Sequence, residues 1–128
     1  DCLLSRGLGD VYKRQVQIGS NTSIAANTYI LSRNEIRIGS DCAISWECQI
    51  MDTDFHEVIE NRNKVTENSS VIIGNHVLVC SKVTILKGVV IGDNAVIAAG
   101  SVVTKDVPAG CIAAGSPARV VRKNINWK

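Results

Sequence analysis

Aromatic residues are scarce in this 128-residue chain: they make up 4% of it, although hydrophobic residues make up 45%. A core of stacked aliphatic side chains is therefore expected, rather than one built around aromatic rings. No apolar run approaches the length of a membrane span, and no secretory signal is evident. The formal net charge is only +2, which excludes a general basic surface for nucleic acid or membranes. The length suits a single domain.

The chain also lacks the cysteine patterns of a disulfide or zinc framework. Its five cysteines are an odd number and form no C-x-x-C pair. They are Cys2, Cys42, Cys48, Cys80 and Cys111. We interpret them as reduced core thiols of a cytoplasmic protein.

A six-residue period runs through the second half of the chain. Counting by six from Ile73 places an aliphatic residue at every step, namely Ile73, Val79, Ile85, Ile91, Ile97 and Val103. A second series, from Val71 to Val107, places a small or branched residue at every step. A period of six fits neither an isolated α-helix nor a plain strand. It predicts a parallel β-helix built from hexapeptides.

One phrase, apolar-x-Ile-Gly followed by two polar residues, occurs four times, beginning at Val16, Ile36, Val71 and Val89. Its first three residues predict a short strand, and its glycine and polar residues predict a corner. Three strands and three corners make one triangular coil of 18 residues, which is the spacing between Ile73 and Ile91. The chain is long enough for about five such coils.

Two interruptions of this spacing are visible. Ile18 and Ile38 are 20 residues apart, so two extra residues should bulge near Ser32–Glu35. Ile38 and Ile73 are 35 apart, which leaves about 17 residues beyond one coil. We expect them to form a long polar loop near residues 55–70, and such a loop in a compact solenoid is usually functional or disordered.

The ends of the chain do not follow the period. Residues 1–15 are interpreted as a non-native leader left by gene assembly, with a native N-terminal cap as the alternative. Residues 16–123 are assigned to the β-helix domain, and residues 124–128 to a C-terminal tail that could act as a short cap.

The chain has two histidines, and only one of them lies where the repeat fails. Continuing the hexad count through Ile50 puts His56 in an apolar core position and Asp54 in a small one. Burying such groups unpaired would cost roughly 2–7 kcal/mol or more. The chain must therefore leave the coil there, or the two groups must pair. Both outcomes place a histidine beside carboxylates at the mouth of the loop, whereas His76 falls at an exposed corner.

The segment from Ile91 to Arg122, I-G-D-N-A-V-I-A-A-G-S-V-V-T-K-D-V-P and then A-A-G-S-P-A-R-V-V-R, resembles the maltose, galactoside and serine O-acetyltransferase group of hexapeptide-repeat acyltransferases. The phrase I-M-D-T-D-F-H resembles the acyltransferases of surface polysaccharide. The resemblance covers Val16 to about Lys123. It implies a left-handed parallel β-helix, a homotrimer, and acetyl transfer from acetyl-CoA to a hydroxyl or amine. Left-handedness rests on the resemblance alone.

The resemblance also implies roles for individual residues. His56 occupies the place of the family's catalytic histidine and would act as the general base, with Asp52, Asp54 or Glu57 orienting it. The positions that match CoA-binding residues are Ser81, Ala99, Thr104, Lys105, Arg119 and Arg122. Arginine suits the phosphates of CoA because guanidinium binds phosphate bidentately. Leu78 and Cys80 depart from the Trp and Gly that the family usually has there.

The expected function is thus an acetyl-CoA-dependent O-acetyltransferase that acts on a sugar or similar small acceptor and needs no metal. Two alternatives stay open: a xenobiotic acetyltransferase of streptogramin or chloramphenicol type, and a non-catalytic trimeric β-helix module. A γ-type carbonic anhydrase shares the fold but needs three histidines per zinc, which two histidines cannot easily supply. Trp46 should point outward, to pack against a neighbour or stack on a sugar ring.

Overall fold

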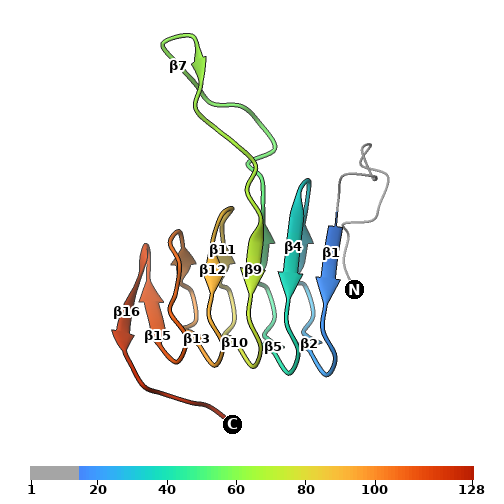
Figure 1. Ribbon diagram of the computed structural model, residues 1–128, viewed down its shortest axis with the longest axis vertical. Coiled ribbons are helices and arrows are strands. Elements are labelled where there is room, and N and C mark those ends of the chain that lie inside the picture. Colours follow the sequence, from blue (N-terminus) through green and yellow to red (C-terminus); the bar gives the residue numbers. More distant parts are fainter. Residues whose placement is uncertain (1–14) are drawn as a thin grey trace.

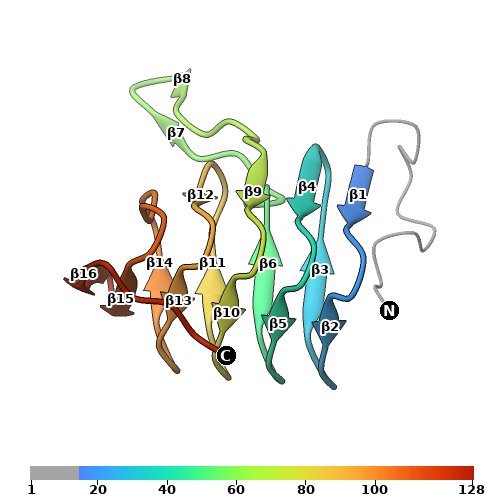
Figure 2. The ribbon, with the colours of Figure 1, turned by 60° about the horizontal axis from the view of Figure 1, so that its bottom comes forward.

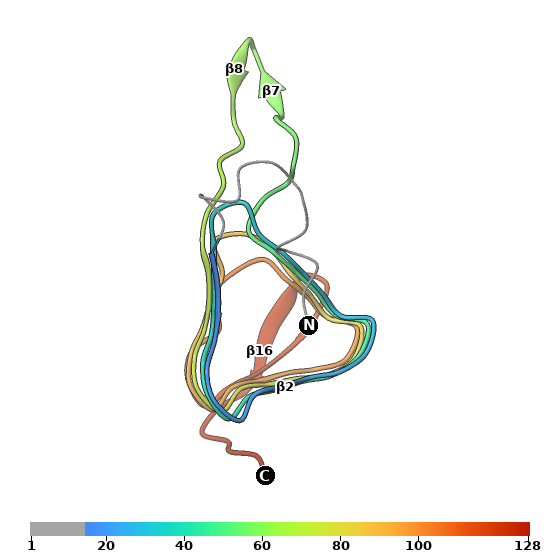
Figure 3. The same cartoon turned by 90° about the vertical axis from the view of Figure 1, so that its right-hand side faces the viewer.

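The computed structural model describes residues 15–128, whose strands and turns build one solenoid with a projecting arm (Figure 1). Seen end on, the chain winds around a triangular prism whose coils superimpose (Figure 3). The predicted all-β, left-handed parallel β-helix of about five coils is confirmed. Within the described residues, no helix has the length and apolar character that a bilayer crossing requires.

Three sheets form the faces of the prism, and all their strand pairs are parallel except that of β15 with β16. Sheet A contains β1 (Gln15–Ile18), β4 (Glu35–Ile38), β9 (Val71–Ile73) and β12 (Val90–Ile91). Sheet B contains β2 (Ser23–Ile24), β5 (Ala43–Ile44), β10 (Leu78–Val79), β13 (Val96–Ile97), β15 (Ile112–Gly115) and β16 (Ala118–Arg122). Sheet C contains β3 (Tyr29–Leu31), β6 (Gln49–Met51), β11 (Thr84–Ile85) and β14 (Val102–Val103). We name the three corners AB, BC and CA after the sheets that they join.

The pairing register reproduces the spacing counted in the sequence. Ile18 pairs with Ile38, Ile38 with Ile73, and Ile73 with Ile91. The extra residues must therefore leave the coils between these partners. The short bulge lies at residues 32–34, between β3 and β4, as predicted.

The long insertion leaves the solenoid at the CA corner and spans residues 52–70, between β6 and β9. It carries a small antiparallel hairpin of β7 (Ile59–Glu60) and β8 (Asn63–Lys64). Figures 1 and 3 show this hairpin at the tip of an arm that projects away from the prism. The predicted loop near residues 55–70 is confirmed, and it begins slightly earlier than expected because Asp52 already turns out of the coil.

Aliphatic side chains fill the prism, as the scarcity of aromatic residues suggested. The largest side chains with less than 2% exposure include Ile30, Ile36, Ile50, Ile85, Ile91 and Ile97. Three of the free cysteines, Cys42, Cys48 and Cys111, are buried among them, and Cys80 is half-buried. Cys2 lies outside the described residues. Burial raises the pKa of the thiols of Cys42, Cys48 and Cys80.

The AB corner is tight because glycines stack there from coil to coil. A Cβ atom on Gly39 would overlap the carbonyl of Gly74, and one on Gly74 would overlap the side chain of Asp93. Two residues further along each turn, Asp41 and His76 adopt left-handed backbone conformations, with φ of 60° and 54°. The coils touch here through their backbones, so this corner fixes their spacing.

The two ends of the solenoid differ. β1 begins at Gln15, one residue before the predicted boundary, and residues 1–14 of the predicted leader lie outside the described part of the chain. At the other end β16 pairs antiparallel with β15 and lies across the end of the prism (Figure 3). This strand, and not the final residues, covers the last coil.

The C-terminal tail returns along the AB corner, as the view in Figure 2 shows. The amide of Ile125 donates to the carbonyl of Gly110 at 2.9 Å. The Trp127 ring stacks on the His76 ring with 4.0 Å between centroids, and its Nε1 donates to the His76 carbonyl at 2.7 Å. His76 is therefore a half-covered corner residue that holds the tail.

Candidate active site

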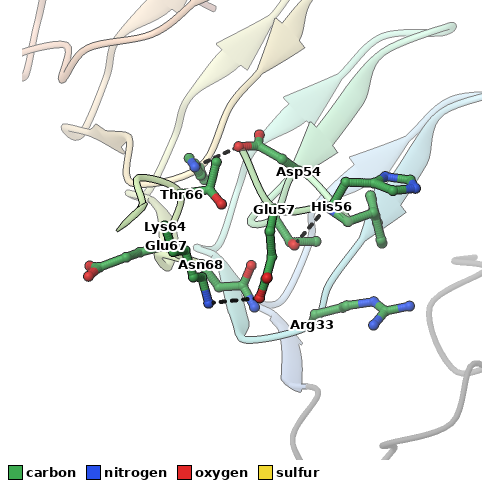
Figure 4. A pocket seen from close by; sticks show the side chains of 11 residues that line it. Arg33, Asp54, His56, Glu57, Lys64, Thr66, Glu67 and Asn68 are labelled. Carbon is green, nitrogen blue, oxygen red and sulfur yellow. Dashed lines mark hydrogen bonds and ion pairs between the residues drawn. The ribbon is translucent and has the colours of Figure 1, made fainter. Parts of the chain in front are cut away.

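His56 lies at the base of the arm, on the CA corner (Figure 4). The preceding residue, Phe55, has a φ of 62°, and its amide donates to the hydroxyl of Thr53 at 3.0 Å. This turn brings His56 out of the apolar position that the hexad count assigned to it. Its side chain is exposed, and within residues 15–128 no side chain forms a hydrogen bond with the imidazole. Of the two outcomes expected for Asp54 and His56, the chain has taken the first: it leaves the coil.

Asp52 is fully buried at the start of the arm, with 0% of its surface exposed. Its Oδ1 accepts a hydrogen bond from the Arg33 amide at 2.8 Å. Its Oδ2 accepts from the Asn34 amide at 2.9 Å and from the Ser32 hydroxyl at 2.7 Å. Asp52, one of the three carboxylates expected to orient His56, is thus engaged by the bulge of the preceding coil.

The other two carboxylates near His56 form ion pairs with lysines. Asp54 Oδ2 lies 2.6 Å from Lys87 Nζ, and the two side chains are 44% and 27% exposed. Glu57 Oε2 lies 3.3 Å from Lys64 Nζ on the arm. Neither carboxylate contacts the imidazole, which Figure 4 shows directed away from both. The described residues therefore leave both ring nitrogens of His56 free to contact a ligand.

A cavity of about 140 Å³ lies between the base of the arm and the CA corner. Its lining residues include His56, Arg33, Asp54, Phe55 and Lys87. Sites for small molecules usually measure roughly 300–1,000 Å³. One copy of the chain thus provides only part of a site that could enclose two substrates.

The residues matched to CoA binding fall in three places. Thr104 and Lys105 follow β14 on the CA corner, the corner that also carries His56. Since β11 separates β14 from β6, the spacing between strands puts them about 10 Å from the base of the arm. Arg119 and Arg122 lie on β16, with exposed side chains. Neither arginine nor Lys105 forms an ion pair within the described residues, so their charges are free to bind an anion.

Ser81 and Ala99 lie on a different corner, BC. The Gly100 amide donates to the Ser81 carbonyl at 3.0 Å, and the Lys82 amide donates to the Trp46 carbonyl at 3.1 Å, which stacks these turns in register. Sheet C separates this corner from His56, and the chain crosses that face between residues 82 and 87, a distance on the order of 15 Å. A single copy therefore does not bring all the predicted residues together. Trp46 is 56% exposed on the same corner, as expected.

The cavity residues that were not singled out from the sequence include Arg33, Phe55 and Lys87. Arg33 lies in the bulge whose existence was predicted, so the extra residues were the available signal. Lys87 precedes Lys105 by one coil of 18 residues, which places both lysines on the same corner. Phe55 is the only phenylalanine of the chain, and it directly precedes His56.

Potential metal ligands do not gather at this site. Within the described residues there is no group of three or more His, Cys, Asp and Glu side chains arranged to hold an ion. His76 faces Asn94, whose Oδ1 lies 2.9 Å from its Nδ1, and Trp127 covers its ring. The two histidines thus lie on different corners and have different surroundings.

Comparison with known proteins identifies relatives of this repeat. The family profile described as "Bacterial transferase hexapeptide (six repeats)" matches residues 70–105. The chain is 37% identical over 116 residues to the polysialic acid O-acetyltransferase of Escherichia coli O1:K1 / APEC, covering 88% of this chain and 38% of that protein. It is 38% identical over 105 residues to an uncharacterized 24.8 kDa protein in the cps region of Klebsiella pneumoniae, covering 82% and 47%.

Solved structures agree with these relatives. The polySia-specific acetyltransferase NeuO superimposes with a TM-score of 0.86 at 36% identity, covering 88% of this chain and 54% of that one. A galactoside acetyltransferase in complex with coenzyme A gives a TM-score of 0.77 at 34% identity, covering 85% and 55%. The chain spans about half the length of these relatives, or less. By its repeat, its coil geometry and these similarities, the chain belongs to the bacterial hexapeptide-repeat transferase family.

Proposed function

We propose that the chain is an acetyl-CoA-dependent O-acetyltransferase whose acceptor is a hydroxyl of a sugar, in the synthesis or modification of surface polysaccharide. The observation that carries this proposal is the placement of His56. It is exposed in a cavity at the only long insertion of the described solenoid, and none of residues 15–128 occupies its ring nitrogens. The named sugar and polysialic acid acetyltransferases among the relatives support a sugar acceptor.

His56 would act as the general base. Its unprotonated ring nitrogen takes the proton of the acceptor hydroxyl while the hydroxyl oxygen attacks the thioester carbonyl. Backbone amides stabilise the tetrahedral oxyanion that forms. When the intermediate collapses, the C–S bond breaks and the imidazolium returns its proton to the departing thiolate. Asp52 fixes the position of the bulge that lines the cavity, since its oxygens accept hydrogen bonds from the amides of Arg33 and Asn34.

The donor would lie on the C-terminal side of the arm. Ser81 and Ala99 would contact the pantetheine portion of CoA, and Thr104 and Lys105 its distal part. Arg119, Arg122 and Lys105 have no ion-pair partner in the described part of the chain, and their positive charge suits its phosphates. A galactoside acetyltransferase that resembles this chain has been solved with coenzyme A. No metal has a part in this reaction scheme.

We propose that the functional unit is a homotrimer with its sites between copies. The small cavity and the separation of the BC corner from His56 both support this arrangement, because a second copy would add its own corner to the cavity. The flat faces of a triangular prism suit closed cyclic packing. The free cysteines favour a reducing compartment, so we place the protein in the cytoplasm.

The proposal is tested by release of free thiol from acetyl-CoA in the presence of different acceptors. The panel contains sialic acid oligomers, maltose, a galactoside, chloramphenicol and a streptogramin. We expect release that depends on a sugar acceptor, with CoA binding detectable by calorimetry. Release only with the antibiotics would make the chain a xenobiotic acetyltransferase. Absence of both release and CoA binding would leave a non-catalytic module.

A further inference from the structure

We propose that Arg33 binds a carboxylate of the acceptor, so that the enzyme acts on an acidic sugar. This inference rests on the proposed function, in which His56 receives the acceptor hydroxyl. Arg33 lies in the bulge of residues 32–34, between β3 and β4. Both residues line the same cavity at the CA corner.

The backbone of Arg33 is held in a fixed position. Its amide donates to the buried carboxylate of Asp52 at 2.8 Å, and the amide of Asn34 donates to the same carboxylate at 2.9 Å. Hydrogen bonds to a buried charge are stronger than those between neutral groups. An exposed side chain on so firmly held a bulge suits recognition, because little backbone entropy is lost when a ligand binds.

The guanidinium of Arg33 is held in turn by an aromatic ring. Its Cζ lies 5.4 Å from the centroid of Phe55, within the range of a cation–π contact. Phe55 directly precedes His56 and adopts a φ of 62°, a conformation that bulky residues rarely take. The turn that exposes the base is therefore the turn that supports the arginine.

The ion pairs within the cavity leave the positive charge of Arg33 available to bind a ligand. The other two cations that line it are neutralised, Lys87 by Asp54 and Lys64 by Glu57. Arg33 has no carboxylate partner among residues 15–128. Glu67 is the remaining carboxylate of the lining, and Figure 4 shows it on the opposite side from Arg33.

The order of strands in sheet C separates donor from acceptor. The order is β14, β11, β6 and β3, so Thr104 and Lys105 lie on one side of the arm and Arg33 lies on the other. His56 lies between them. The same order holds if the donor residues come from a second copy related by rotation about an axis parallel to the solenoid. Arg33 is thus on the acceptor side of the base, away from the groups proposed for the CoA phosphates.

The planar guanidinium matches a carboxylate through two parallel hydrogen bonds, and a neutral hydroxyl cannot replace this pairing. The test compares a short sialic acid oligomer with the same oligomer after its carboxylates are reduced to alcohols. Binding of each is measured by calorimetry in the presence of CoA, so the result does not depend on turnover. We expect wild type to bind the acidic oligomer about ten-fold more tightly or better.

Three variants complete the experiment. Arg33→Gln should lose the preference, and Arg33→Lys should keep only part of it. Arg37→Gln is the matched control, since Arg37 lies on sheet A and pairs with Glu35 at 2.6 Å; it should keep the preference in full. Affinity for CoA should be the same in all of these proteins.

The inference would be overturned by equal binding of the two oligomers by wild type, which includes binding of neither, or by a preference that survives in Arg33→Gln. A fall in CoA affinity in Arg33→Gln would reassign Arg33 to the donor phosphates and would also overturn it. Failure of the proposed function gives a different result, namely no acceptor-dependent thiol release from acetyl-CoA whatever the oligomer affinities are.

Discussion

The carboxylate of Asp52 accepts a hydrogen bond of 2.7 Å from the hydroxyl of Ser32, a residue 20 positions earlier, and both side chains are buried. This bond joins the short bulge of one coil to the start of the arm in the next. Asp52 also accepts from two backbone amides of the bulge. One buried carboxylate thus positions both walls of the candidate site.

Replacing Asp52 should destabilise the fold. Asp52→Ala leaves buried donors without an acceptor, so the free energy of unfolding should fall by about 2–4 kcal/mol, as measured by urea denaturation. Asp54→Ala is the matched control in the same segment. Its ion pair with Lys87 is partly exposed, and removing it should cost less than about 1 kcal/mol. Equal losses in the two variants would contradict the role given to Asp52.

Replacing the base should stop transfer without weakening donor binding. His56→Ala should lower kcat by roughly 10²–10⁴-fold, since it removes the proton acceptor. Affinity for CoA, measured by calorimetry, should stay close to that of wild type. His76→Ala is the control, because His76 lies on the AB corner and holds Trp127. If His56→Ala kept its activity, or His76→Ala lost it, His56 would not be the base.

Removing the cations of β16 should weaken donor binding. Arg119→Gln and Arg122→Gln should each raise the Kd for CoA by about ten-fold, the usual size of a lost charged hydrogen bond. For CoA that lacks its 3′-phosphate, at least one of these substitutions should weaken binding less than it does for intact CoA. That substitution identifies the arginine that contacts the 3′-phosphate. The wild-type affinity should fall with added salt. Unchanged affinity in both variants would place the phosphates elsewhere.

Alkaline pH should unfold the solenoid more easily. Burial raises the pKa of the Cys48 thiol above its ordinary value of 9.0, so the folded state favours the neutral form. The contribution of this thiol to the free energy of unfolding is fully present below pH 9.0, and it is lost as the pH rises toward the pKa of the folded state. Urea midpoints measured between neutral and alkaline pH should show this fall for wild type.

Cys48→Ala should flatten that pH dependence, although it lowers stability at every pH. Val83→Ala is the control, since Val83 is also fully buried and carries no titratable group. It should lower stability while keeping the wild-type slope. A slope that Cys48→Ala does not change would show that other groups cause the alkaline loss.

The fold was predictable because one period repeats along the chain. The pairs Ile18 with Ile38, Ile38 with Ile73, and Ile73 with Ile91 follow from counting alone, since each coil places its strands above those of the coil before. The break at Asp54 and His56 likewise marked the arm. A local pattern of apolar residues is sufficient for these predictions, because burial decides them.

The partners within the site were not predictable in the same way. Asp54 pairs with Lys87, 33 residues away, and Asp52 binds the bulge. Choosing between these partners depends on the direction of each side chain once the chain has left the coil, and periodicity says nothing of that direction. The return of the tail to His76 was missed for the same reason, since a single stack of two rings has no repeat to reveal it.

The stacked glycines of the AB corner determine where this scaffold can accept new chain. Inserted residues there would separate backbones that touch, as at Gly39 and Gly74, and would shift every later coil. The CA corner already accommodates two insertions of different length, at residues 32–34 and 52–70, while the strands on either side stay in register. A designer who wished to graft a foreign recognition loop would therefore choose the turn at Gly88, where the same corner passes through the next coil.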